Sequence, residues 1–358
     1  MKYLEGKRVL ITGGTGSLGK VMVRRLLSGE MGEPEKVIVF SRDEAKQHFM
    51  RMEYQLKSAA TDEIIYRNFQ RKLDFRIGDI RDFHSVAGVL RDADVVFNAA
   101  ALKQVPTCEY FPYEAVRTNV LGAENIVRAI EQFNLQVDTV VGISTDKACK
   151  PINTMGMTKA LQERVFIQGN IRCPQTRFLC ARYGNVLASR GSVVPLFHDQ
   201  IRGGGPITIT TAEMTRFLLS LDDAVDTVFA AITTGLPGET YVPRAPSALV
   251  TDIAQALIGT RRIDVKFIGI RPGEKIHEIM VSQEEAYRTV ARGKWFAILP
   301  LLPEVCGDWR GSGVLDKEYS SADTVMTLDE TAKLLRDRGL MFEDGAIAKE
   351  YEAAEMLR

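Results

Sequence analysis

The sequence has few of the residues that build cross-linked or metal-dependent sites. Its 358 residues include five cysteines and four histidines, which are scattered and form no Cys-x-x-Cys pair. An odd, sparse set of cysteines argues against a disulfide framework and is typical of a reducing cytosol. No metal-ligand spacing occurs either. We therefore expect a cytoplasmic protein without a bound metal.

An excess of charge and long apolar runs are also missing. Lysine plus arginine and aspartate plus glutamate both total 46, so the formal net charge is zero. Nucleic-acid-binding proteins usually carry a basic excess or stripe, and we expect no nucleic-acid partner. No run of about 18 apolar residues occurs, so we expect no membrane span. The first eight residues lack the apolar region of a signal peptide.

What the sequence does contain is a regular alternation of strand and helix patterns. Six apolar runs have the length of buried parallel strands, namely 8–11, 36–40, 75–79, 95–100, 137–143 and 177–182. Helical periodicity separates them, as in 43–57, 116–133 and 155–166. In 43–57 the expected buried face is Phe49, Met52 and Leu56. The alternation predicts an α/β fold, a Rossmann-type doubly wound parallel sheet, whose ligands bind beyond the carboxyl ends of the strands.

A glycine-rich turn joins the first strand to the first helix. Such a turn lets a pyrophosphate approach backbone amides at a helix N-terminus, and its place between strand and helix favours a dinucleotide site. The alternative is a tight turn without a ligand. Cofactor contacts are expected from Gly13, Thr15, Gly16, Ser17, Leu18 and Gly19.

The end of the second strand indicates which dinucleotide binds. NAD sites place an acid there for the ribose 2′-hydroxyl. Ser41 and Arg42 come first instead and suit a 2′-phosphate, so we expect NADP, while Asp43 and Glu44 keep NAD as the less favoured choice. Asp79 is expected near the adenine, with a helix N-cap as its alternative. Other expected cofactor contacts are Ile80, Ala99, Ala100 and Ala101.

Regular alternation ends near residue 185, where glycine- and proline-rich turns such as 203–206 and 234–238 begin. We expect an NADP-binding Rossmann domain over 1–184. A smaller, mainly substrate-binding lobe is expected over 185–330, with some segments returning to the first domain. Residues 331–358 are expected to form a helical tail.

A charged pair directly follows the fifth strand. A protonated Asp146 and a Lys147 with a lowered pKa could together donate and remove protons at the sheet edge. The alternative is a turn-capping aspartate beside a solvated lysine. Lys159, on the next helix, is expected to anchor the nicotinamide ribose and to lower neighbouring pKa values through its charge.

Together these segments resemble the extended short-chain dehydrogenase/reductases. Within that superfamily the chain is similar to the UDP-N-acetylglucosamine 4,6-dehydratases of bacterial surface-polysaccharide synthesis. The resemblance extends to about residue 280, with a weaker match at 319–321. Its segments are 40–44, 99–106, 118–122, 144–148, 182–186, 189–193 and 271–275.

The resemblance implies a lyase. Bound NADP would take a hydride from C4 of the sugar, Lys147 would remove the C5 proton, and Asp146 would protonate the departing C6 hydroxyl before the hydride returns to C6. Thr145 would hydrogen-bond near O4. Some relatives also invert C5, and the short members form hexamers. The resemblance therefore implies a homo-oligomer, a dimer or a hexamer.

The sequence lacks one side chain that most of these relatives use. Their Tyr-x-x-x-Lys motif deprotonates the C4 hydroxyl, but this chain reads Met155-Gly156-Met157-Thr158-Lys159. A thioether cannot exchange a proton, and Met155 most simply fills the space of the tyrosine ring. The capsule-forming branch that this chain resembles carries methionine here. Lys159 is the first candidate for the O4 base and Lys147 the second.

A diphosphate sugar needs cationic hydrogen-bond donors, and arginine forks suit phosphate oxygens. UDP-N-acetylglucosamine is the expected substrate, although a guanine nucleotide remains open. The alternative for each arginine is a surface ion pair, such as Arg271 with Glu274. Expected substrate contacts are Lys103, Asn185, Arg190, Ser192, Val193, Arg216, Arg271, Glu274 and Lys275.

Two other functions stay open. A 4-epimerase or reductase has the same fold, but epimerases need the tyrosine at O4 and would leave the Asp146–Lys147 pair without a clear use. A catalytically inactive NADP-binding regulator is the second alternative. Retention of Asp146, Lys147 and Lys159 together argues against it.

Overall fold

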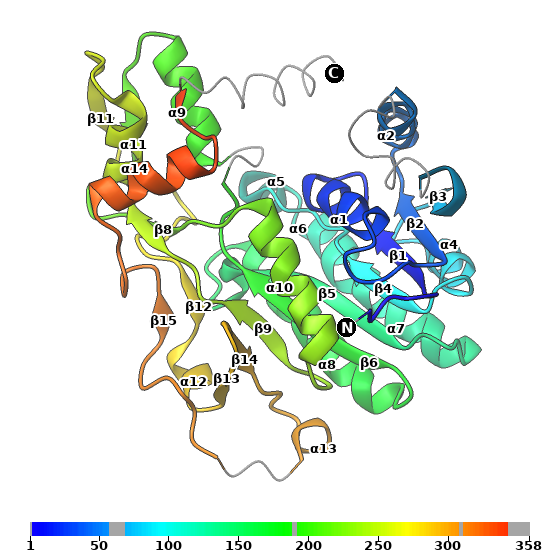
Figure 1. Cartoon of the computed structure of the whole chain (residues 1–358). Helices are drawn as coiled ribbons and strands as arrows, with labels where there is room; N and C mark the ends of the chain where they lie inside the picture. The colour runs from blue at the N-terminus through cyan, green and yellow to red at the C-terminus, as the bar shows by residue number, and fades with distance from the viewer. Residues whose placement is uncertain (1, 57–68, 188–191, 308–310, 343–358) are drawn as a thin grey trace.

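The computed structural model describes residues 2–56, 69–187, 192–307 and 311–342. Within these ranges the largest element is a nine-stranded sheet with the order β13-β14-β9-β6-β5-β4-β1-β2-β3 (Figure 1). The strands from β3 to β9 in this order pair in parallel, and β14 and β13 extend the sheet as an antiparallel hairpin. Their bounds are β1 Arg8–Thr12, β2 Lys36–Ser41, β3 Leu73–Ile77, β4 Val95–Asn98, β5 Thr139–Thr145, β6 Arg177–Tyr183, β9 Thr240–Pro243, β13 Thr289–Arg292 and β14 Trp295–Ile298.

Helices cover both faces of this sheet. Because strand side chains alternate, Val9 and Ile11 join the core under α1 and α10, whereas Leu10 joins the core under α4, α7 and α8. Two helix layers around a mainly parallel sheet confirm the predicted Rossmann-type fold. These helices are α1 Ser17–Leu27, α4 Phe83–Leu90, α7 Gly122–Phe133, α8 Thr154–Arg172 and α10 Leu221–Thr234.

A second lobe lies at the upper left of Figure 1. Its own apolar core joins α9 (Val193–Arg202), α11 (Val250–Ile258) and α14 (Leu328–Asp337). Three short strand pairs complete it: β7 Ile207–Ile209 with β11 Val265–Phe267, β8 Thr215–Phe217 with β10 Ser247–Leu249, and β12 Ile279–Val281 with β15 Tyr319–Ser320. The division at 184, 330 and 358 stays a prediction, and 343–358 lies outside the described residues.

The remaining described helices are one of 13 residues and six of three to six residues. They are α2 Glu44–Leu56, α5 Val105–Tyr110, α6 Pro112–Ala115, the π-helix η1 Val116–Leu121, the 3₁₀-helix η2 Asp146–Ala148, α12 Gln283–Ala286 and α13 Pro303–Cys306. The predicted helix 116–133 therefore begins with a π-helical turn, a feature frequent at functional sites. No helix in the described part of the chain is long and apolar enough to span a membrane.

The predicted inner face of α2 is wrong at Phe49 and Met52, and the side chain of Leu56 lies outside the described part of the structure. Phe49 and Met52 are 41% and 36% exposed, whereas Met50 and Tyr54 are buried. Tyr54 stacks on Phe69 with ring centroids 5.2 Å apart. This contact with a residue distant in sequence selects the face that packs inward, so local periodicity alone was insufficient.

Candidate functional site

The glycine turn brings the start of α1 close to the loop after β4. Gly13 has a φ of +67°, and a Cβ there would lie 2.8 Å from Ala100 Cα. A Cβ on Gly19 would lie 2.5 Å from Gly14 Cα, and Gly16 is the N-cap of α1. Both close approaches require glycine. The turn thus fits a dinucleotide pyrophosphate at the start of α1, where the predicted contacts Thr15, Ser17 and Leu18 also lie.

Ser41 and Arg42 lie at the end of β2, as predicted. The Ser41 hydroxyl accepts a hydrogen bond of 3.0 Å from Gln47 Nε2. Arg42 is 61% exposed at its side chain, with Nη1 4.0 Å from Asp79 Oδ2. Asp43 instead binds α2, where it accepts a 2.9 Å hydrogen bond from the Lys46 amide. The exposed Arg42 guanidinium can therefore turn toward a ligand. The Asp43 carboxylate, in contrast, is already hydrogen-bonded to the first turn of α2.

Asp79 lies close to Arg42, but it is not a helix N-cap. Arg81 holds its carboxylate through Nη2 at 2.6 Å, and the N-cap of α4 is Asp82. Burial raises the pKa of Asp79, but the hydrogen bonds from Arg81 outweigh it and leave this pKa lowered. Ile80 is buried, and it packs where a Cβ on Gly122 would lie 2.8 Å away.

Hydrogen bonds hold the loop after β4 in place. The amide of Ala100 donates to Thr12 Oγ1 at 3.2 Å. The predicted contacts Ala99 and Ala101 flank Ala100, and Ala101 is exposed. Asn119, in the π-helix, accepts from the Leu102 amide at 2.8 Å and donates to Thr158 Oγ1 of α8 at 3.0 Å. Asn119 was not predicted as a site residue. Asn119 thus links the loop after β4 to α8, the helix that carries Met155 and Lys159.

Asp146 and Lys147 meet where β5 passes into η2. Thr145 Oγ1 donates to Asp146 Oδ1 at 2.8 Å, and Lys147 Nζ donates to the same oxygen at 3.1 Å. The ammonium also donates to Asn185 Oδ1 at 2.8 Å and lies 3.4 Å from Glu278 Oε1. The predicted pair is therefore brought together with Asn185 of the next strand's end and with Glu278, which had not been predicted.

Electrostatics at this centre differ from the expectation for Lys147. Burial lowers the pKa of Lys147, but the carboxylates of Asp146 and Glu278 outweigh burial and raise it above its usual value. The predicted lowering was wrong for the protein without substrate, because the second carboxylate was not foreseen. Asp146 is completely buried.

Met155 and Lys159 lie four residues apart on one face of α8. Met155 packs in an apolar cluster with Cys108 and Ala115. Lys159 Nζ donates to the Ile143 carbonyl and, at 2.6 Å, to Gln162 Oε1. Burial lowers the pKa of Lys159 to about 8, although Cys180 and Glu163 oppose this shift. Lys159 therefore loses its proton more readily than an ordinary lysine, one helical turn from Met155.

Gly156 explains how α8 comes so near the charged pair. A Cβ at this position would lie 2.1 Å from the Lys147 carbonyl oxygen. The helix N-terminus is capped by Asn153, whose side chain accepts from the Gly156 amide at 2.8 Å. Only glycine permits this contact between η2 and the first turn of α8.

Several predicted substrate residues already bind protein groups. Arg216 donates to the carbonyls of Thr215, Lys275 and Ile276 at 2.7–3.0 Å. Lys275 Nζ donates to the Cys149 carbonyl at 2.7 Å. In this conformation Arg216 binds within the second lobe, and Lys275 joins that lobe to the segment after η2.

The remaining predicted substrate residues lie on separate segments of the chain, before α5, at the start of α9 and between β11 and β12. Glu274 accepts from Thr210 Oγ1 at 3.2 Å, and no ion pair with the exposed Arg271 is found among the described residues. Ser192 caps α9 ahead of Val193, and its buried hydroxyl has no hydrogen-bond partner in the described ranges. Lys103 is exposed in the loop before α5. The predicted Arg190 lies outside the described residues.

A buried ion-pair network supports the site from behind. Arg182 of β6 binds Glu163 of α8 at 2.7 Å and Glu285 of α12 at 2.8 Å. Ser144, at the end of β5, donates to Glu163 at 2.5 Å. Sequence reasoning had included Arg182 in a resembling segment but gave it no role. The network ties the elements that carry Lys147 and Lys159.

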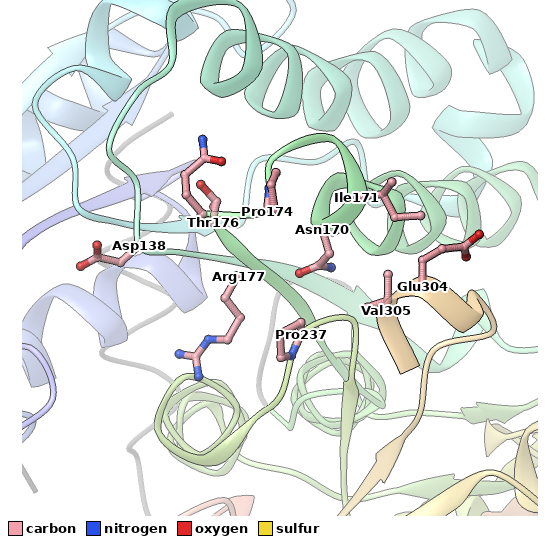
Figure 2. Close-up of a pocket in the computed structure, with 10 residues that line it drawn as sticks. Asp138, Asn170, Ile171, Pro174, Thr176, Arg177, Pro237, Glu304 and Val305 are labelled. Atoms are coloured by element: carbon pink, nitrogen blue, oxygen red, sulfur yellow. The ribbon is translucent and has the colours of Figure 1, made fainter. Parts of the chain in front are cut away.

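A hollow of about 470 Å³ lies at the opposite ends of the strands, where β5 and β6 begin, as Figure 2 shows. Asp138 precedes β5 and Arg177 begins β6, whereas Asp146 and Asn185 follow the other ends of the same strands. This hollow is separate from the candidate site.

The chain can now be compared with known proteins. A model of the family described as polysaccharide biosynthesis protein matches residues 9–300. This chain belongs to that family. Its architecture and relatives make it an extended short-chain dehydrogenase/reductase of the group of nucleotide-sugar dehydratases and epimerases.

Individual relatives carry different names. A UDP-glucose 4-epimerase of Rickettsia conorii is 46% identical over 284 residues, covering 78% of this chain and 79% of its own. The structure of Pen from Bacillus thuringiensis has a TM-score of 0.82 and 31% identity, covering 94% and 99% of the two chains. DesIV of Streptomyces venezuelae, a dTDP-glucose 4,6-dehydratase solved with NAD, shares the fold with a TM-score of 0.61, 22% identity, and coverage of 75% and 86%.

Proposed function

We propose that this protein is a UDP-N-acetylglucosamine 4,6-dehydratase, a lyase that forms a 2-acetamido-2,6-dideoxy-4-hexulose, with or without inversion at C5. The observation that carries the proposal is the Lys147 Nζ to Asp146 Oδ1 contact of 3.1 Å at the end of β5. Elimination of water across C5 and C6 needs both a base and an acid, and this contact supplies the two side by side.

Each member of the pair has a defined task in this proposal. Lys147 first passes its ammonium proton to the Asp146 carboxylate, 3.1 Å away, which leaves a neutral amine beside a carboxylic acid. The amine then removes the proton at C5 while Asp146 gives its proton to the C6 hydroxyl as water leaves, and Lys147 later returns the C5 proton. Because Asp146 is buried and bonded to Thr145 Oγ1, that proton passes through the threonine hydroxyl unless the carboxyl turns outward. Thr145 is also proposed to hydrogen-bond near O4.

The C4 hydroxyl requires a separate base, since Met155 cannot serve. Lys159 supports this role because its pKa of about 8 leaves part of the population neutral near physiological pH. The lysine must leave the Ile143 carbonyl or act through a water to reach the sugar. We retain it as first candidate, with Lys147 as the second.

NADP is the proposed cofactor. The glycine turn fits its pyrophosphate, the exposed Arg42 suits a 2′-phosphate, and Asp43 is engaged at α2. When bound, the nicotinamide would supply transient oxidation at C4. Arg42→Ala should weaken NADP binding while leaving NAD binding nearly unchanged. Equal losses for both cofactors would contradict the assignment.

The nucleotide sugar is proposed to lie between the sheet edge and the second lobe, near Asn185 and Arg216. Exposed cations at Lys103 and Arg271 are further proposed contacts. A cytoplasmic homo-oligomer, dimer or hexamer, remains our prediction.

A 4-epimerase is the second candidate, because relatives 43–46% identical carry that name. An epimerase has to return a hydride to C4 and needs no base at C5. The Asp146–Lys147–Glu278 cluster would then lack a use, which is why we favour the dehydratase.

The two functions give different products. The protein would be incubated with UDP-N-acetylglucosamine and NADP, and the sugar followed by proton NMR. A new C6 methyl signal with a C4 ketone supports the dehydratase. UDP-N-acetylgalactosamine without a new C6 methyl signal would reject it and favour the epimerase. An unchanged sugar despite bound NADP would favour the inactive regulator.

A further inference from the structure

Glu278 lies beside the proposed base although it comes from the second lobe. Its Oε1 is 3.4 Å from Lys147 Nζ, and the side chain is 4% exposed. Its other oxygen, Oε2, is buried and has no hydrogen-bond partner within the described ranges. A buried carboxylate with unused acceptor capacity is costly. Packing alone therefore explains this side chain poorly.

The backbone of Glu278 is tethered on both sides. Its amide donates to Ser321 Oγ at 2.9 Å, and its carbonyl accepts from the Ser321 amide at 2.8 Å. Ser321 Oγ also contacts Thr215 Oγ1 at 2.7 Å. The pairing of β12 with β15 continues directly from this point. The carboxylate therefore approaches Lys147 from a fixed position.

Charged groups face Lys147 from three elements. Asp146 comes from η2, Glu278 precedes β12, and Arg216 comes from β8 with its Nε 3.8 Å from Glu278 Oε1. Burial and Arg216 both lower the pKa of Lys147, and the two carboxylates reverse this. Removing the Glu278 charge would take away an attraction and leave the repulsion from Arg216 uncompensated.

We propose that Glu278 is a positioning residue for Lys147 and sets the pH above which this lysine can act as a base. The Lys147 ammonium donates to Asp146 and Asn185, and the Glu278 carboxylate forms an ion pair with it at 3.4 Å. These contacts fix the direction of Nζ before its proton leaves. The inference rests on the proposed function, because it takes Lys147 as the base at C5.

The test is Glu278→Gln, which keeps the shape and one acceptor oxygen but removes the charge. Deuterium exchange at C5 would be measured against pH in wild type and variant. We expect the midpoint of the rising limb to move about one pH unit lower, the usual effect of losing an opposite charge at this distance. An unchanged midpoint would overturn the proposal, because a merely structural glutamate would alter rate or stability alone.

A second readout does not require turnover. The Cε resonance of Lys147 in ¹³C-lysine-labelled protein, assigned from its absence in Lys147→Arg, should titrate at lower pH in Glu278→Gln. If wild type shows no C5 exchange at any pH, the proposed function fails, yet this titration still decides the role of Glu278. A titration that does not move rejects that role even when the dehydratase activity is present.

The matched control is Glu239→Gln. Glu239 is also buried but pairs with Arg292 at 2.7 Å, away from the site. This variant should keep the wild-type midpoint even if it loses stability. Should Glu278→Gln fail to fold, Ser321→Ala loosens the same carboxylate through its tether. It should move the midpoint in the same direction by a smaller amount, and no movement there would also overturn the proposal.

Discussion

Lys147 and Lys159 approach the candidate site from consecutive elements, and their partners differ. Lys147 faces the carboxylates of Asp146 and Glu278, whereas Lys159 faces the neutral oxygens of Ile143 and Gln162. Burial acts on both lysines. The pKa of Lys147 is nevertheless raised, while that of Lys159 falls to about 8. Charged partners, rather than burial alone, decide which lysine keeps its proton.

This difference divides the proposed chemistry. Lys159 is neutral in part of the population near physiological pH, which suits the early step at the C4 hydroxyl. Lys147 holds its proton until the balance of charge around it changes, which suits the later step at C5. Met155 is compatible with this division because neither step depends on it.

The largest expected effect comes from removing Lys147. Lys147→Ala should reduce C5 deuterium exchange by about 10²- to 10⁴-fold, the usual range for loss of a general base. NADP affinity should remain within about twofold, since the glycine turn is untouched. Lys147→Arg is the matched control, because it keeps a positive charge that cannot dissociate. Substantial exchange in Lys147→Arg would show that the base lies elsewhere.

Removing Lys159 should separate the two steps. Lys159→Met should slow conversion of UDP-N-acetylglucosamine about 10²-fold, because the C4 hydroxyl loses its base. The same variant should still exchange the C5 proton of a preformed 6-deoxy-4-ketone, which requires only Lys147. Both activities are measured by NMR in deuterated water. Loss of both together would contradict the division between the lysines.

Lys159 should also make the free energy of unfolding depend on pH. Its folded pKa of about 8 lies below the ordinary value of 10.5, so the unfolded chain binds more protons between these values. Unfolding free energy should therefore rise with pH through this window, by up to roughly 3 kcal/mol, and the burial penalty should be fully present below pH 8. The free energy of unfolding would be measured by urea denaturation at several pH values, and the difference between wild type and Lys159→Met isolates the contribution of Lys159. A flat difference would mean that Lys159 is not desolvated.

The smallest effect is expected at Met155. Met155→Leu conserves volume in the cluster with Cys108 and Ala115 and should cost less than about 1.5 kcal/mol. Turnover should stay within about threefold of wild type. A loss of a hundredfold would show that the thioether takes part in the reaction.

The sequence predicts the sheet and the glycine turn well because both depend on local patterns. Gly13 and Asp146 follow their strands directly, and parallel strands place their carboxyl ends at one edge. Glu278 could not be placed this way, since the β12–β15 pairing that positions it is long-range. Arg216 remains a predicted substrate contact, and the Lys275 and Ile276 carbonyls that it binds in this conformation are distant in sequence, so they could not be foreseen from local patterns. The face of α2 was likewise decided by Phe69.

The most direct test is a pH titration of both lysines in the free protein by ¹³C NMR of labelled Cε, assigned with Lys147→Arg and Lys159→Met. The account predicts that Lys147 titrates above ordinary lysines and Lys159 well below them. Two ordinary titrations, or the reverse order, would contradict the claim that this site raises the pKa of one lysine and lowers that of the other.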